Sequence, residues 1–201
     1  MEIENTFENA NPNEVYIPIL DDPIAEREVT DDIQDIKANK APGPDGIPPG
    51  VFRLMNASWI LFITFILNSV FFATYPLSWT IAKLFSVFKG GDPSDPGNYR
   101  GINIMAALPK LYDHILNNRL KQWFTSDEEQ AGAKKGRGCE EQILTLRRLI
   151  DAARKLKTPL YIIFVDFEKA YDKINRVTLM QLLQHMGCGS NMVRAIKNSS
   201  K

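Results

Sequence analysis

The sequence predicts an α+β fold that is rich in helix and carries a small, incomplete sheet. Two segments, 105–123 and 140–156, repeat apolar residues at the spacing of a helix that buries one face. Two shorter runs, 79–88 and 160–165, have the β-branched and aromatic content that is typical of strands. The length of 201 residues and the 44% hydrophobic content fit one globular domain with an appendage.

Acidic residues gather at the start of the chain. Residues 1–35 contain eleven Asp or Glu residues and one basic residue, Arg27, which gives this part a net charge of −10. Because the formal net charge of the whole chain is zero, the remainder carries +10. Prolines and the lack of any period predict an acidic, disordered linker or tail over 1–29 and a domain over 30–201. A basic body is consistent with nucleic-acid binding, although ordinary solvated charge is the simpler explanation on charge alone.

The first elements of the domain are predicted from capping and turn residues. Thr30 is expected to cap a short helix that ends near Asn39. The segment 41–50, APGPDGIPPG, excludes both helix and strand interior, so it predicts a turn centred on Asp45-Gly46.

An uncharged stretch follows from Leu54 to Ala82, and its densest part is 59–73, WILFITFILNSVFFA. This part approaches the length of a membrane span but contains polar residues, so a buried core helix is the preferred interpretation. Residues 89–100 then form a loop rich in turn residues, and one or two helices broken near Gly187 and Gly189 are expected at the end.

The cysteine and histidine content limits the classes of protein. Two cysteines, Cys139 and Cys188, cannot staple a secreted fold and indicate a reducing, intracellular compartment. With two histidines they make a closed structural zinc site unlikely, since that site needs four ligands at paired spacings. The first ten residues lack the basic start and apolar run of a secretory signal.

Asp166 directly follows the apolar run 160–165, LYIIFV, which is expected to be a central strand covered on both faces. A buried carboxylate without a partner is costly, so this group should be neutralised, paired or bound to a metal ion. Two interpretations stay open from the pattern alone. Asp166 either caps the next turn or pairs with Lys169 or Lys173, or it binds Mg²⁺, which prefers carboxylate and phosphate oxygens.

The string FVDFEKAYDKINR at 164–176 resembles the first catalytic motif of reverse transcriptases from non-LTR (LINE-type) retrotransposons. Four earlier segments are similar to that family in the family's own order: KAPGPDGIP at 40–48, the segment from Trp79 to Ile102, LPKLYDHILNNRL at 108–120 and EQAGAKKGRGCEEQI at 129–143. The resemblance covers roughly residues 30–197. It implies a partial right-hand polymerase, consisting of the fingers and the N-terminal part of the palm.

The resemblance implies a nucleotide site around the first motif. Asp166 matches the catalytic, metal-binding aspartate, with Mg²⁺ as the expected cofactor, and the backbone carbonyl of Phe167 can face the same ion. The backbone amides of Lys169 and Ala170 match positions near the incoming triphosphate. Tyr171 matches the aromatic ring that stacks under the sugar and leaves no room for a 2′-hydroxyl group. The alternative for Tyr171 is an ordinary core residue.

Five cations are implied as contacts to phosphate. Lys89 and Arg100 look like the fingers residues that grip the triphosphate of a dNTP, and an arginine can do so with two hydrogen bonds. Lys134, Lys135 and Arg137 lie in a glycine-rich loop that is expected to hold the backbone of the RNA template or the DNA primer. Ordinary solvated Lys and Arg side chains remain the alternative for Lys89 and Arg100.

The sequence departs from the family in this loop and after the first motif. The usual Gly-Phe-Arg is replaced by Gly132-Ala133-Lys134, so an aromatic packing anchor is lost and the geometry of the loop is in doubt. The second catalytic motif, Tyr-x-Asp-Asp, and the thumb are absent from these 201 residues, and no Asp or Glu follows Asp172.

One carboxylate cannot assemble a two-metal site. The 201 residues are therefore expected to be inactive alone and to need the missing palm and thumb. The alternatives are a non-catalytic nucleic-acid-binding module and a membrane-associated protein that uses 59–73. If the strand expected at 160–165 lacks a neighbour, its open edge predicts aggregation.

Overall fold

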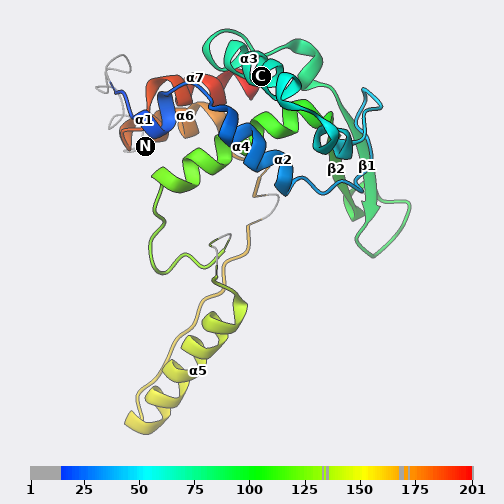
Figure 1. The fold of residues 1–201 in the computed structure, drawn as a ribbon. Helices are drawn as coiled ribbons and strands as arrows, with labels where there is room; N and C mark the ends of the chain where they lie inside the picture. The colour runs from blue at the N-terminus through cyan, green and yellow to red at the C-terminus, as the bar shows by residue number, and fades with distance from the viewer. Residues whose placement is uncertain (1–14, 133, 135, 168–169, 172, 201) are drawn as a thin grey trace. The chain divides into compact units, whose positions relative to one another are not determined.

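The computed structural model describes residues 15–132, 134, 136–167, 170, 171 and 173–200 (Figure 1). The chain divides into two compact units. The large unit comprises Met1–Trp123 and Asn175–Lys201, and the small unit comprises Phe124–Ile174. Each unit is described by itself.

The large unit is built from helices and one β-hairpin. Its helices are α1 (Pro18–Asp21), α2 (Glu26–Asp35), α3 (Ala57–Phe72), α4 (Ala107–Trp123), α6 (Arg176–His185) and α7 (Ser190–Ser199). Strands β1 (Ala82–Phe88) and β2 (Tyr99–Met105) pair antiparallel, and 3₁₀ helices lie at Pro49–Leu54, Leu77–Thr80 and Pro96–Asn98. The small unit contains α5 (Cys139–Leu156). This arrangement agrees with the helix-rich α+β fold expected from the sequence.

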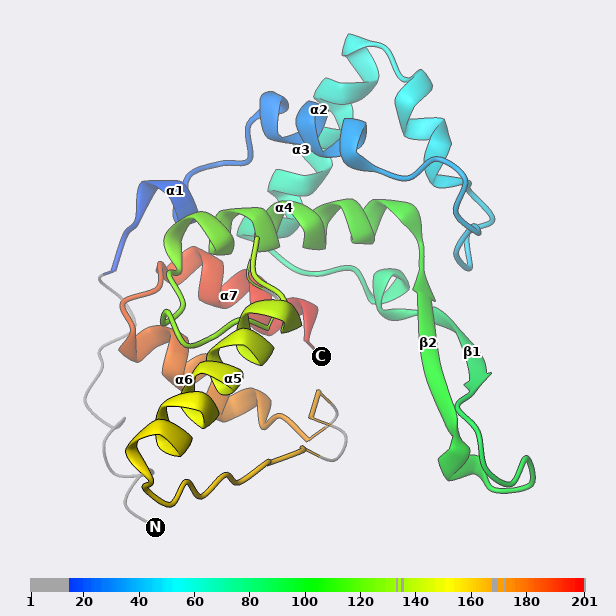
Figure 2. The ribbon, with the colours of Figure 1, turned by 90° about the horizontal axis from the view of Figure 1, so that it is seen from below.

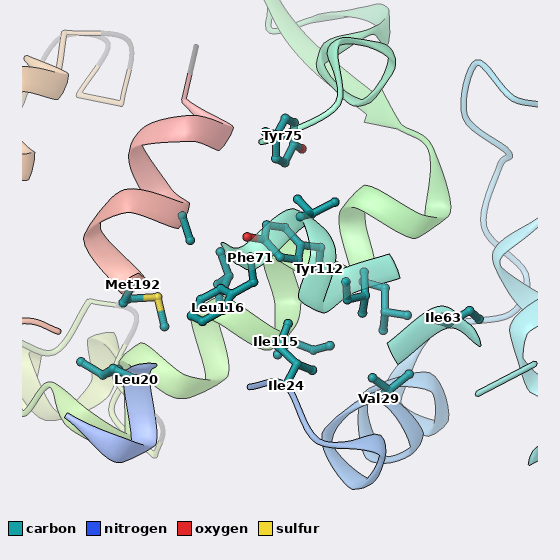
Figure 3. Packing of buried hydrophobic residues seen from close by; sticks show 14 of the residues in the cluster. Leu20, Ile24, Val29, Ile63, Phe71, Tyr75, Tyr112, Ile115, Leu116 and Met192 are labelled. Atoms are coloured by element: carbon teal, nitrogen blue, oxygen red, sulfur yellow. The ribbon is translucent and has the colours of Figure 1, made fainter. Parts of the chain in front are cut away.

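Helix α4 forms the centre of the large unit. It packs against α1 and α2, while α7 packs against α1, α3 and α6. Figure 2 shows that α4 continues almost directly from β2, with Ala106 as the single residue between them. Figure 3 shows side chains from α1, α2, α3 and α7 gathered around those of α4. The fully buried residues of this core include Leu20, Val29, Leu67, Phe71, Leu111, Tyr112, Ile115 and Met192.

The folded structure begins before residue 30. Leu20, Ile24 and Val29 are buried, and residues from Val15 onward are described, whereas the sequence favoured a tail over 1–29. Residues 1–14 lie outside the described part. Helix α2 starts at Glu26 rather than at Thr30. The Glu28 carboxylate accepts a hydrogen bond from the Ala25 N–H at 2.8 Å and so satisfies a backbone donor at the start of the helix.

Asp21 caps a helix that lies far away in the sequence. Helix α7 begins after Gly189, which has no side chain to cap it. The buried Asp21 carboxylate instead accepts hydrogen bonds from the backbone N–H groups of Asn191 at 2.9 Å and Met192 at 3.1 Å. The first turn of α7 is thus held by α1 and not by its own N-cap residue.

Helix α3 lies close to the predicted range 59–73, but it is only partly buried. Asn56 caps it by accepting a hydrogen bond from the Trp59 N–H at 3.2 Å. One face packs into the core, and the other exposes large apolar side chains, among them Trp59, Leu61, Phe62 and Phe65. Within the described residues, no helix combines the length and the apolarity needed to cross a membrane.

Residues 160–165 do not form the central strand that the sequence predicts. They are extended in the described structure without strand pairing, and their side chains are exposed, with Ile163 at 87%. A strand needs a neighbour to satisfy its N–H and C=O groups, and no other described segment pairs with this one. The expectation of a buried strand was therefore wrong for this chain, and the exposed apolar run keeps the predicted aggregation hazard open.

The remaining helices agree with the sequence. The expected helices at 105–123 and from residue 140 onward are α4 and α5. The last helices are separated at Gly187–Gly189, where Gly187 adopts a φ of +77° that favours glycine. Strand β2 differs from the expectation, because Tyr99 and Arg100 begin a strand and are not the end of a loop over 89–100.

Asp113 on α4 gives the core a pH dependence. Its carboxyl group is partly buried and has no ion-pair partner among the described residues, and burial raises its pKa from 3.8 to about 6. Between these values the folded chain keeps a proton that the unfolded chain releases, so stability falls as pH rises through this window.

We therefore expect Asp113→Asn to be more stable than the parent chain at pH 8, by up to about 3 kcal/mol, and similar to it at pH 4. Urea unfolding of both chains at the two pH values measures this difference. An asparagine variant that is less stable at pH 8 would contradict the assignment.

Candidate functional site

The β1–β2 hairpin brings together two of the cations that the sequence singled out. Arg100 on β2 lies opposite Val87 on β1. One further hydrogen bond continues the pairing beyond the ends of the strands, because the Lys89 N–H donates to the Asn98 carbonyl at 2.8 Å. Opposed residues share a face and neighbours alternate, so Lys89 and Arg100 occupy the same face as diagonal neighbours, roughly 7–8 Å apart at Cα. Both residues are exposed.

The loop that joins the two strands is ordered by its own side chains. The Asp92 carboxylate accepts hydrogen bonds from the backbone N–H and the hydroxyl of Ser94, which lower the pKa of Asp92. The Tyr99 hydroxyl donates to the Pro93 carbonyl at 2.9 Å, and the Tyr99 ring packs against Phe88 with centroids 5.4 Å apart. These contacts fix the turn that sets the spacing of Lys89 and Arg100.

The segment at 40–48 is tied to the other end of the hairpin. It contains the predicted turn, because the Gly46 N–H donates to the Gly43 carbonyl at 3.2 Å and Gly46 has a φ of +73°. Gly43 lies against the backbone between β2 and α4. A Cβ atom added at Gly43 would lie 2.5 Å from the Cα and N of Ala106, so only glycine fits here.

The residues implied for catalysis lie in the small unit. Asp166, Phe167, Ala170 and Tyr171 are all exposed, and the Tyr171 side chain reaches 90%. The predicted positions Lys169 and Lys135 lie outside the described residues. Exposure argues against the alternative that Tyr171 is a core residue in this chain.

The described residues do not fit a two-metal site. Among them, no group of three or more His, Cys, Asp or Glu side chains is arranged to hold a metal ion. Asp166 is one carboxylate, and the Phe167 carbonyl adds one uncharged oxygen at most. A magnesium centre for nucleotidyl transfer needs more acidic ligands than this.

Two cations of the basic loop at 131–138, Lys134 and Arg137, are paired with acidic neighbours. Glu128 accepts a hydrogen bond from Arg137 and lies 3.4 Å from the Lys134 ammonium, and Arg137 also donates to Glu141 at 2.8 Å. The hydrogen bond and charge of Lys134, together with the charge of Arg137, lower the pKa of Glu128. Binding of nucleic-acid phosphate by Lys134 and Arg137, which stays a prediction, would have to replace these ion pairs.

Arg119 is a residue whose role the sequence analysis missed. Its guanidinium is buried and donates two hydrogen bonds to the Glu28 carboxylate, both at 2.7 Å, and others to the carbonyls of Asp22 and Pro23. It also lies 5.5 Å from the ring centroid of Phe71. The available signal was an arginine at a core position of the helical period, one turn after Ile115.

The comparisons define the class of protein. Residues 88–200 match the family described as reverse transcriptase (RNA-dependent DNA polymerase), which is more than half of the chain. The chain therefore belongs to the reverse transcriptase family, as the motifs at 40–48 and 164–176 indicated.

Its homologues are RNA-directed DNA polymerases of non-LTR retrotransposons. The probable RNA-directed DNA polymerase from transposon BS of Drosophila melanogaster is 27% identical over 81% of this chain and 18% of the relative. The Pol polyprotein from type-1 retrotransposable element R2 of Popillia japonica is 27% identical over 82% of this chain and 22% of the relative. The Pol polyprotein from type-1 retrotransposable element R1 of Bradysia coprophila is 30% identical over 76% of this chain and 16% of the relative. The chain spans about a fifth of the length of these relatives.

Proposed function

We propose that this chain is the fingers and first palm portion of a retrotransposon RNA-directed DNA polymerase and that it binds the incoming nucleotide. The observation that carries the proposal is the hairpin face with Lys89 and Arg100. Transfer of a phosphoryl or nucleotidyl group depends mainly on positioning and on cations that stabilise the phosphate charge. Two exposed cations on one rigid hairpin face suit the triphosphate of a dNTP.

Asp166, the Phe167 carbonyl, the amides of Lys169 and Ala170, and the Tyr171 ring are proposed to complete the nucleotide site. The acidic cluster needs further carboxylates from outside these 201 residues, since no Asp or Glu follows Asp172. The chain alone should thus bind a nucleotide without incorporating it. The RNA template and DNA primer are the proposed partners of the complete polymerase.

A second candidate is a non-catalytic nucleic-acid-binding module derived from a retroelement. Within the described part of the chain, Asp166 belongs to no group of three or more His, Cys, Asp or Glu side chains that could hold a metal ion, and this favours the second candidate. This candidate predicts RNA binding by the chain without any specific contribution of Lys89 and Arg100 to dNTP binding.

The first test measures nucleotide binding. We expect Lys89→Gln and Arg100→Gln each to weaken the binding of fluorescently labelled dTTP roughly tenfold, because each removes one charge-assisted phosphate contact. Lys197→Gln, an exposed lysine on α7, is the matched control and should leave the Kd unchanged. Equal affinity in all three variants would refute the proposed role of the hairpin face.

Primer extension on an RNA template with dNTPs and Mg²⁺ separates the two parts of the proposal. No templated product is expected from the 201-residue chain or from Asp166→Ala. A product that disappears in Asp166→Ala would show that these residues suffice for catalysis and would overturn the expected inactivity.

A further inference from the structure

A pocket of about 230 Å³ lies in the large unit between the end of α2 and the first turns of α4. Its apolar lining includes Ile36, Ala107 and Leu111. Three lysines, Lys37, Lys40 and Lys110, line the same pocket. The pocket therefore combines an apolar floor with positive charge that comes from two separate parts of the chain.

The charge of this pocket is only partly compensated by the residues that line it. Asp35 is the acidic residue of the lining, so three lysines against one aspartate give the lining a net +2 with His114 neutral. Among the described residues, none of these three lysines has a carboxylate within ion-pair distance. This differs from the basic loop of the small unit, where Glu128 and Glu141 neutralise Lys134 and Arg137. Unpaired like charges around one pocket repel one another, and an anion would relieve that repulsion.

The backbone adds to the attraction for an anion. The pocket includes the first turn of α4, a helix of 17 residues whose N-terminus carries a partial positive charge. The position of the pocket is fixed as well. Gly43 packs on Ala106 and holds the segment that starts with Lys40, while the carboxylate of Asp32 lies 3.2 Å from the Nδ1 atom of His114.

The pocket is separate from the proposed nucleotide contacts. Strand β2 carries Arg100 near its start and reaches α4 after Met105, so five residues lie along the strand between the two places. At the rise of an antiparallel strand this is about 17 Å. A triphosphate bound at Arg100 would not reach the pocket across this distance. A nucleic-acid strand carries a phosphate at every nucleotide, so one of its phosphates can lie in the pocket.

We propose that this pocket binds a backbone phosphate of single-stranded RNA, with Lys37, Lys40 and Lys110 as the contacts. The proposal rests on the proposed polymerase function, because an RNA template is the substrate that such a chain must hold. It adds to that function a phosphate site away from the hairpin face and from the basic loop.

The test uses the whole chain and a fluorescein-labelled 12-nucleotide RNA. We expect the triple variant Lys37→Gln, Lys40→Gln, Lys110→Gln to weaken binding at low salt by about tenfold or more. We also expect it to reduce the slope of log affinity against log salt by about 0.7, since the pocket neutralises one phosphate and each phosphate of a single strand contributes about 0.7. Circular dichroism should be unchanged, because all three side chains are exposed.

The matched control replaces three other exposed lysines, Lys121, Lys155 and Lys197, by glutamine and so changes the net charge equally. This control should retain both affinity and slope, and a triple Lys→Arg variant of the pocket should retain binding. Equal losses in the pocket and control triples would overturn the proposal, as would the absence of any RNA binding by the parent chain.

A second arm with labelled dTTP distinguishes the pocket from the nucleotide site. The pocket triple should bind dTTP as the parent does. Loss of dTTP binding with retained RNA binding would overturn the pocket proposal in favour of a nucleotide pocket. Unchanged dTTP binding in Arg100→Gln would count against the proposed function and would leave the RNA result unaffected, so the two failures can be told apart.

Discussion

Replacing Arg119 by methionine is expected to lower the free energy of unfolding by about 3–5 kcal/mol. Arg119 is 4% exposed. Its guanidinium donates two parallel hydrogen bonds to the Glu28 carboxylate and another to a backbone carbonyl that follows α1. Methionine fills much of the volume but donates no hydrogen bond. The variant would remove both guanidinium donors from the partly buried Glu28 carboxylate, which keeps the Ala25 N–H, and would leave several carbonyl oxygens without the donor they have in the parent chain. Urea denaturation of the parent and variant chains measures the loss.

Three comparisons show whether the hydrogen bonds of Arg119 cause this loss. Lys121→Met, on an exposed position of the same helix, should change stability by less than about 0.5 kcal/mol. Arg119→Lys should recover only part of the loss, because an ammonium group cannot form the two parallel bonds. Adding Glu28→Gln to Arg119→Met should cost less than the sum of the single changes. Full stability in Arg119→Met would contradict the interpretation.

The same pair predicts acid sensitivity in the large unit. Burial alone would raise the pKa of Glu28, but the hydrogen bonds from Arg119 and from the Ala25 N–H, with the charge of Arg119, lower it. Stability from this pair is present above the pKa of Glu28 in the unfolded chain and is lost as pH falls through the lower folded value. Asp113 acts in the opposite sense, since its raised pKa removes stability as pH rises.

The spacing of apolar residues and the positions of helix-breaking residues predicted the helices well. They did not predict which segments pack against one another. Helices α4 and α5 follow from apolar residues at helical spacing, and the separation of α6 from α7 follows from Gly187. The prediction of a buried strand at 160–165 was wrong. An apolar run indicates that burial would be favourable, but it does not show whether a partner strand is present. The acidic, proline-containing composition before residue 30 predicted a tail, yet Leu20 and Ile24 are buried. A few apolar side chains are enough to pack such a segment onto the core.

The candidate site could be predicted as a set of residue types but not as an electrostatic surface. The sequence indicated cations at Lys89, Arg100 and the loop at 131–138. It did not reveal that Glu128 forms ion pairs with Lys134 and Arg137 of that loop, because the pairing depends on the turn between them. The lysine pocket was missed for a similar reason. Lys37 and Lys110 are far apart along the chain and come together only when α2 and α4 pack.

Gly43→Ala is expected to destabilise the large unit by about 1–3 kcal/mol, the usual cost of overpacking a tight site. The added Cβ atom would lie 2.5 Å from the Ala106 Cα and N and from the Met105 carbonyl oxygen. These are backbone atoms at the junction of β2 and α4, so no side-chain rotation can relieve the contact. The segment at 40–48 must move away from the junction, and thermal unfolding of the variant measures the cost.

The same displacement should separate Lys40 from Lys110, which lies on α4 beyond the junction. Gly43→Ala should therefore also weaken RNA binding at temperatures where the chain remains folded, while dTTP binding at the hairpin changes less. A Gly43→Ala chain with parental stability and RNA affinity would show that the junction tolerates an extra carbon, and the glycine would then have no role in holding the lysine pocket together.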